Sequence, residues 1–159
     1  MNPRYTSRVA VTRPANDTAY AAGDVLGAAS ASVIEFTNLA PVGGGPVLIT
    51  HGALLAEVAA IPSGLGIVRL HLYSAAPTAI ADNDAFDLPA GDRAKYLGSI
   101  SLSLNATCDL GATVFVEDDY LRKQIIASSS SIFGIAQTLA AYTPTSEAVL
   151  NWELHTIES

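Results

Sequence analysis

The chain has 159 residues, half of them apolar and only 14% charged, and its formal net charge is −7. This length predicts a single domain, and a mean hydropathy of +0.34 excludes disorder over most of the chain. An acidic protein is repelled by phosphate backbones, so we expect no nucleic-acid partner. The most apolar run, residues 52–61, is too short to cross a bilayer and contains Glu57, so we expect no membrane partner either.

Positive charge is concentrated at the amino terminus. Residues 1–16 contain Arg4, Arg8 and Arg13 and no acid, so they carry +3 and the rest of the chain carries −7 − 3 = −10. No apolar segment follows these arginines, so a secretory signal is not expected. Residues 1–12 are predicted to be an N-terminal arm or a first strand, and residues 13–159 to form the domain. We expect Arg4 and Arg8 to contact a neighbouring subunit, because the planar guanidinium suits carboxylates. The alternative is a solvated tail.

Apolar and polar residues alternate in short segments along the rest of the chain. Strands are predicted at 8–12, 32–37, 47–51, 68–73, 99–104, 112–117, 121–126 and 150–155. The alternation is clearest at 68–73, 99–104 and 150–155, and it is typical of antiparallel sheets with one face in water. In the segment 68–73 it places Arg69, His71 and Tyr73 on the outer face.

Two segments are ambiguous. Residues 53–61 could form a helical turn, and residues 132–142 fit both a helix and a strand. A strand is favoured for 132–142 because Gly134 weakens a helix. Eight or nine short strands in one domain, separated by turn residues, predict an all-β fold. We expect a single-domain antiparallel β-sandwich, jelly-roll-like, with one or two short helical turns.

No combination of residues in the sequence indicates catalysis. The histidines, His51, His71 and His155, lack a metal-ligand spacing, and His71 and His155 are expected at a surface or interface. Cys108 precedes Asp109, which would raise rather than lower a thiol pKa, so an inert thiol is expected. Neither a nucleophile elbow nor a phosphate-binding loop is present. We therefore expect no enzyme activity, no catalytic residue, no cofactor and no metal.

The acidic segment 82–87 begins like a calcium-binding loop but does not complete one. Phe86 stands where the third ligand belongs, and Asp87 where the glycine would be. A turn or helix start is predicted instead, with Asp82 or Asn83 as the cap and Phe86 in the core.

Four segments resemble small virion proteins of tailed bacteriophages, some of which are capsid decoration or cement proteins. They are TRPANDTAYAAGDV at 12–25, DNDAF at 82–86, YLG at 96–98 and AYTPTS at 141–146. The resemblance spans nearly the whole chain, but its motifs are turns without chemistry. The matching positions imply framework turns at Arg13, Pro14, Tyr20, Gly23, Asp24, Asp82, Phe86, Tyr142 and Pro144.

The resemblance implies a β-sandwich or jelly roll that sits as a dimer or trimer on the outer shell. Such a protein is made in the bacterial host cytoplasm, binds the major capsid protein and bridges neighbouring capsomers without catalysis. The candidate interface residues are Arg4, Arg8, Arg69, His71 and Tyr73, and Arg13 is expected to stay with its own domain.

A lectin-like or receptor-binding module of a virion is the alternative. Tyr5, Tyr73 or Trp152 could stack on a sugar ring. However, Trp152 alternates with Leu150 and Leu154 on the inner side of its strand, which favours a place in the core.

Overall fold

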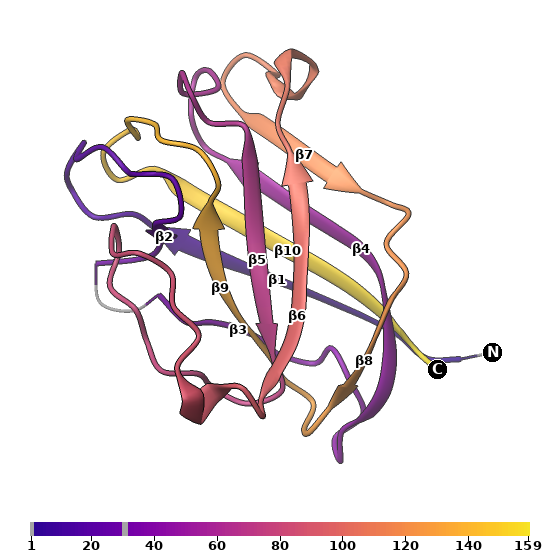
Figure 1. Ribbon diagram of the computed structural model, residues 1–159. Coiled ribbons are helices and arrows are strands. Elements are labelled where there is room, and N and C mark those ends of the chain that lie inside the picture. Colours follow the sequence, from indigo (N-terminus) through magenta and orange to yellow (C-terminus); the bar gives the residue numbers. More distant parts are fainter. Residues whose placement is uncertain (1, 30–31) are drawn as a thin grey trace.

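The computed structural model describes residues 2–29 and 32–159 (Figure 1). The strands are β1 (Arg4–Thr12), β2 (Val25–Leu26), β3 (Ile34–Phe36), β4 (Gly45–Ala56), β5 (Ile67–Tyr73), β6 (Tyr96–Ser103), β7 (Val114–Asp118), β8 (Lys123–Ala127), β9 (Ile132–Thr138) and β10 (Val149–Glu158). Two short 3₁₀ turns, η1 (Ala90–Asp92) and η2 (Ala106–Cys108), are the helical elements of the described residues. Among these residues there is no helix of the length and apolarity needed to cross a membrane.

The strands form two antiparallel sheets that pack face to face. The first sheet has the order β1-β10-β4. Both β7 and β8 pair with the edge of β4 that is opposite to β10. In the second sheet β2 and β3 both pair with β9, followed by β5 and β6. If β2 with β3, and β7 with β8, each count as one interrupted strand, the ten strands become eight.

Numbered along the chain, these eight strands have the order 1-8-3-6 in one sheet and 2-7-4-5 in the other. This is the order of a jelly roll, two four-stranded sheets built from two Greek keys. The prediction of an all-β, jelly-roll-like sandwich is confirmed. Figure 1 also shows the two chain ends side by side, because β1 and β10 are neighbours in the first sheet.

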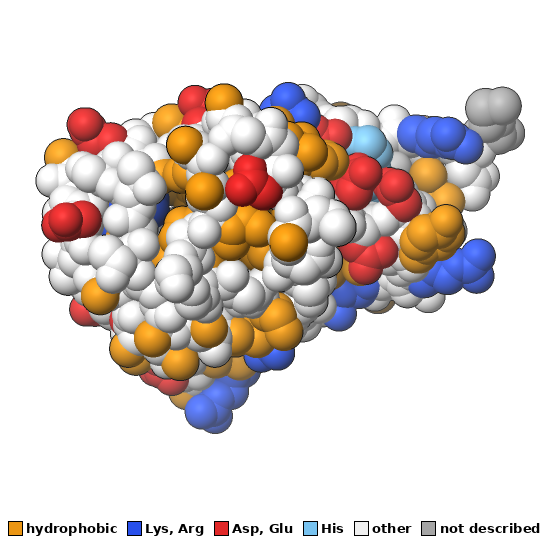
Figure 2. Space-filling model, turned by 90° about the horizontal axis from the view of Figure 1, so that it is seen from above, with side chains coloured by type: hydrophobic (Ala, Val, Ile, Leu, Met, Phe, Trp, Pro, Cys, Tyr) orange, Lys and Arg blue, Asp and Glu red, His pale blue; other side chains and the backbone are white. Residues whose placement is uncertain are grey.

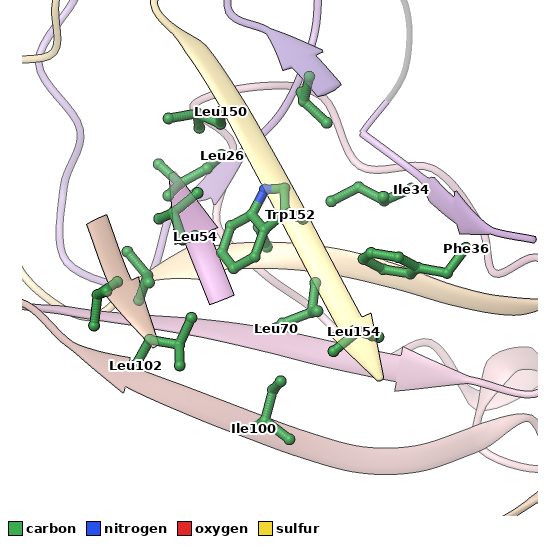
Figure 3. Close-up of a cluster of buried hydrophobic side chains, with 14 of the residues drawn as sticks. Leu26, Ile34, Phe36, Leu54, Leu70, Ile100, Leu102, Leu150, Trp152 and Leu154 are labelled. Atoms are coloured by element: carbon green, nitrogen blue, oxygen red, sulfur yellow. The ribbon is translucent and has the colours of Figure 1, made fainter. Parts of the chain in front are cut away.

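The inner faces of both sheets build one apolar core. On β10, Leu150, Trp152 and Leu154 are buried, whereas the residues between them are half-buried on the outer face. Figure 3 shows Trp152 between the sheets, with Leu54 and Leu70 nearby. The period-two alternation thus places every second side chain in the core, and the inward position expected for Trp152 is confirmed.

The two ambiguous segments both contribute strands. The helical turn suggested for 53–61 is wrong, because β4 continues to Ala56 and pairs with β10 on one side and β7 on the other. The strand favoured for 132–142 is confirmed over residues 132–138, which form β9. Gly134 lies where side chains of its own sheet crowd the strand, since a Cβ there would come within 2.8 Å of Leu70 Cδ1 on β5 and 3.2 Å of Phe36 Cε2 on β3. Glycine allows that contact inside a central strand.

Residues 4–12 of the segment predicted as an arm or first strand form strand β1 and not a free arm. Strand β1 pairs with β10 over its whole length, from Arg4 opposite Ile157 to Thr12 opposite Val149. Its outward positions are exposed, and Val11 packs into the core. The first-strand alternative is therefore the one that the structure adopts.

The segment between β5 and β6 folds back over the outer face of the second sheet. Its side chains Ile80, Phe86 and Leu88 pack against a small second cluster that contains Tyr73 and Ile135. The expectation that His71 and Tyr73 are exposed is consequently wrong, since they are 5% and 1% exposed. Alternation identified the outer face correctly, but a loop covers that face.

Candidate functional site

A buried polar network joins three turns at one end of the sandwich. Arg13, only 2% exposed, donates through Nε to the Tyr20 hydroxyl and through Nη1 to the Thr145 carbonyl at 3.0 Å. The Tyr20 hydroxyl in turn donates to Asp82 Oδ1 at 2.6 Å, and the rings of Tyr20 and Tyr142 stack with centroids 5.1 Å apart. Burial, followed by the hydrogen bond to Asp82, raises the pKa of Tyr20 far above its usual value. The network holds the three turns together.

The other framework residues secure neighbouring turns. The Pro14 carbonyl accepts from the Asn16 and Glu147 amides at 2.8 and 3.1 Å, and Pro144 is buried. The Gly23 carbonyl accepts from the Phe86 amide at 2.9 Å, and Asp24 Oδ2 accepts from the Ala21 amide at 2.6 Å. The structure thus places these residues in the backbone turns around the network.

The segment 82–87 is a turn, and the Asp82 carboxylate is hydrogen-bonded to other groups of the protein. Asp82 Oδ1 also accepts from the Gly27 amide at 2.8 Å, and Asp82 Oδ2 lies 3.5 Å from Arg13 Nη2. Asn83 takes the left-handed conformation, with φ of 67°. The interpretation of this segment as a turn is confirmed, and Phe86 packs against the second apolar cluster.

His71 is a buried structural histidine. Its Nδ1 accepts from the Tyr96 hydroxyl, and its Nε2 donates to Gln137 Oε1, both at 3.0 Å. Its ring stacks on Phe86, with centroids 3.7 Å apart. Burial lowers the pKa of His71; the proximity of Arg69 also lowers it, while the hydrogen bond to Gln137 opposes both. The neutral ring is therefore the form that this environment stabilises.

Of the other interface candidates, Arg4 and Arg8 are exposed on β1, and Arg69 is half-buried on β5. Arg8 forms an ion pair within the chain: its Nη2 lies 2.6 Å from Glu153 Oε2 on the adjacent strand β10. Cys108 is buried at 8% exposure, as expected for an inert thiol.

The outer face of the first sheet carries a cluster that sequence spacing did not reveal. His51 on β4 lies opposite His155 on β10, and their ring centroids are 4.3 Å apart. His155 Nε2 donates to Glu153 Oε1, and His51 Nδ1 donates to Asp119 Oδ1, both at 2.6 Å. Burial alone would raise the pKa of Glu153, but the hydrogen bonds from His155 and Arg8 lower it below its usual range. Figure 2 shows histidine beside acidic side chains on the molecular surface.

This cluster contains the residues that could hold a metal ion in the described part of the chain. They form two groups that share His51: one with Glu153 and His155, and one with Glu117 and Asp119. The fold therefore brings two histidines together although they lack a metal-ligand spacing in the sequence. The only signal that could have revealed the cluster is the register of β4 against β10, which depends on contacts between residues about a hundred positions apart.

No protein-family model matches the chain, and a search of the curated proteins finds no match. Among solved structures, a chain of the Israeli acute paralysis virus particle aligns at 10% identity over 97% of this chain and 68% of that one, with a TM-score of 0.40. A chain from the capsid of Helicobacter pylori bacteriophage KHP30 aligns at 10% identity over 99% of this chain and 93% of that one, with a TM-score of 0.33.

The adhesin domain of Lys-gingipain from Porphyromonas gingivalis aligns at 12% identity over 80% of this chain, with a TM-score of 0.35. The aligned region is 63% of that domain's length. These likenesses are too weak to assign a fold or a function, and the jelly-roll assignment rests on the strand order.

Proposed function

We propose that this chain is a structural protein of a bacteriophage virion that decorates the outer surface of the capsid and bridges capsomers. One observation carries the proposal: the phage-like turn motifs coincide with the buried network that holds a jelly roll together. Arg13, Tyr20, Asp82 and Tyr142 come from three of the four matching segments and meet at one point. Jelly rolls serve as capsid domains and also as lectins and cupins, so fold alone does not choose between these functions.

The polar side chains of the chain's interior support a structural role over a catalytic one. Arg13 and His71 are each held by partners within the protein. Polar groups whose hydrogen bonds are all satisfied within the protein rigidify the core and specify a unique packing. We expect no enzymatic activity.

The outer face of the first sheet is the surface that suits docking. On β1 the residues Arg4, Thr6, Arg8, Ala10 and Thr12 all point outward and are exposed. These positions replace His71 and Tyr73, which are buried, as the candidate contact residues. We expect Arg4 to contact carboxylates of the major capsid protein or of a second copy, whereas Arg8 first has to leave Glu153.

We expect the protein to form a closed dimer or trimer on the shell. A specific interface buries roughly 800 Å² on each partner, which is about a tenth of the 7433 Å² accessible surface of this chain. The fold can provide such an area on one sheet face. In the host cell the protein would be made in the cytoplasm and would then join the virion.

A decoration assay tests this proposal. Fluorescent protein is mixed with phage shells assembled without it, and the occupancy is measured after sedimentation. We expect saturable binding that weakens with salt and that the substitution Arg4→Glu reduces. Arg93→Glu makes the same charge change at an exposed position beside η1 and should leave binding unchanged. No binding of the unsubstituted protein would contradict the proposal, and equal occupancy of all three proteins would remove Arg4 from the interface.

The lectin-like alternative loses most of its candidate residues. Trp152 and Tyr73 are each 1% exposed, and Tyr5 is half-buried against the core. Tyr120, at 91% exposure, is the aromatic side chain best placed to stack on a sugar. Glycan-array binding that is lost on Tyr120→Ala would favour this alternative over decoration.

A further inference from the structure

Two histidines from distant parts of the chain meet on the outer face of the first sheet. His51 and His155 are register partners on β4 and β10. Glu153 lies two residues before His155 and therefore on the same face of β10. The ligand atoms that these three side chains offer all lie within 4.8 Å of one another. We propose that His51, His155 and Glu153 bind a divalent transition-metal ion, with Zn²⁺ as the ion that suits them best.

The distances suit this ion after a small adjustment. Tetrahedral Zn²⁺ with bonds of about 2.0–2.2 Å holds its ligand atoms about 3.3 Å apart. The farthest pair, at up to 4.8 Å, therefore has to approach by roughly 1.5 Å. Rotation of the half-buried Glu153 and His155 side chains can supply this movement while the strand backbones stay paired. Two imidazoles and one carboxylate, with a water as the fourth ligand, form a set that zinc accepts and that Ca²⁺ and Mg²⁺ do not prefer.

Neighbouring side chains already orient two of the ligands. His51 Nδ1 donates to Asp119 Oδ1 at 2.6 Å, which leaves Nε2 as the metal-binding atom. Arg8 donates through Nε to Glu153 Oε2 at 2.7 Å, which leaves Oε1 for the ion. Carboxylates and hydrogen-bond donors around metal sites fix their ligands in this way.

The ion would take the place of one proton. His155 Nε2 now donates its hydrogen to Glu153 Oε1 at 2.6 Å. When Zn²⁺ bonds to that nitrogen and that oxygen, the ring hydrogen moves from Nε2 to Nδ1, so that His155 stays a neutral imidazole and no electron transfer is involved.

The charge around the cluster also favours a cation. Glu117, Asp119 and Glu153 against Arg8 give a formal sum of −3 + 1 = −2. Glu117 and Asp119 form a second group with His51, but this group has a single imidazole, and both carboxylates are exposed. The group with two imidazoles is therefore the better zinc site. An ion there would link β4 to β10 beside the irregularity between His155 and Thr156.

Calorimetric titration of the chelator-treated protein with Zn²⁺ tests the site. We expect one ion per chain, a higher unfolding temperature with Zn²⁺, and no saturable binding of Ca²⁺ or Mg²⁺. Co²⁺ in place of Zn²⁺ should give the visible absorption of a tetrahedral complex. The absence of saturable Zn²⁺ binding would overturn the proposal.

Four substitutions locate the ion. His155→Gln and His51→Gln should each abolish one-to-one binding, and Asp119→Asn should weaken it by about 10–100-fold, as loss of an orienting partner does. Glu117→Gln, the control on the same face, removes a nearby charge but no ligand of this group, so it should keep one-to-one Zn²⁺ binding and weaken it less than Asp119→Asn does. Retained binding in His155→Gln together with loss in Glu117→Gln would overturn the assignment.

A folding control accompanies these measurements. His51 is buried, so its substitution could destabilise the fold, and unfolding of each metal-free variant is therefore measured in parallel. The His155 side chain is 37% exposed, so His155→Gln is the decisive variant. Zn²⁺ binding is measured on the isolated protein, so its result does not depend on whether the protein binds a capsid.

Discussion

The Tyr20 hydroxyl donates to Asp82 Oδ1 at 2.6 Å and joins two turns that are 62 residues apart in the chain. Asp82 also faces the buried guanidinium of Arg13. The pair therefore links the segment after β1 to the long connection between β5 and β6.

Substitutions at the two ends of this contact should differ in cost. Tyr20→Phe removes two hydrogen bonds, the one to Asp82 and the one from Arg13 Nε, and should lower the free energy of unfolding by at least about 1.5–3 kcal/mol. Asp82→Ala leaves the guanidinium of Arg13 buried without its anion and should cost about 3–5 kcal/mol. Tyr120→Phe, on an exposed tyrosine, should change stability by less than about 0.5 kcal/mol. Urea denaturation measures all three, and equal effects of Tyr20→Phe and Tyr120→Phe would contradict the network.

His71 should make the protein less stable in mild acid. Its pKa in the folded protein is lowered, chiefly by burial, from the ordinary value of 6.5. The unfolded chain therefore binds more protons than the folded one as the pH falls through 6.5, and stability present above that pH is progressively lost.

Urea denaturation of the protein and of His71→Gln at a series of pH values measures this effect. The variant is expected to be less stable at neutral pH, because the stacked ring is lost, but to lose less stability on acidification. Parallel pH curves for the two proteins would contradict the assignment of this loss to His71.

Gly64 should be far less tolerant of alanine than Gly111, although both adopt positive φ. The angles are +93° and +92°, so the backbone strain is shared. A Cβ at Gly64 would lie 2.4 Å from the Ala141 carbonyl oxygen, whereas none of the described atoms lies within 4 Å of one at Gly111. We expect Gly111→Ala to cost about 1 kcal/mol and Gly64→Ala clearly more. Equal unfolding midpoints for the two variants would show that the close approach at Gly64 is relieved without cost.

Trp152 should be the most sensitive single position of the core. It is 1% exposed between the sheets, and its Nε1 lacks a hydrogen-bond partner among the described residues. Trp152→Ala should cost about 3–5 kcal/mol because it leaves a cavity. Trp152→Phe should cost less, since it keeps an aromatic ring and removes the unpaired N–H. A larger loss for Trp152→Phe than for Trp152→Ala in thermal unfolding would contradict this account.

Short-range patterns predicted the architecture because they report which face of a strand meets the core. The alternation at 68–73 and 150–155 placed Leu70 and Trp152 inward, as the structure has them. Two kinds of information were absent from such patterns. The loop that covers His71 and Tyr73 depends on where Phe86 packs, and the pairing of His51 with His155 depends on long-range register.

Strand β4 is a second case in which a local sequence pattern did not predict the structure. Residues 53–61 contain alanine and leucine, which favour a helix in isolation. Pairing with β10 and β7 on both sides of Leu54 overrides that preference. The framework turns could be identified in the sequence, but the hydrogen bonds between Arg13, Tyr20 and Asp82 required the fold.

A cryo-electron microscopy map of the phage particle tests the proposed function most directly. The account predicts jelly-roll density outside the capsid shell, repeated with the symmetry of the shell, with the outer face of β1 and Arg4 against neighbouring protein. A map that resolves every protein of the capsid surface and contains no density for this chain there would contradict it.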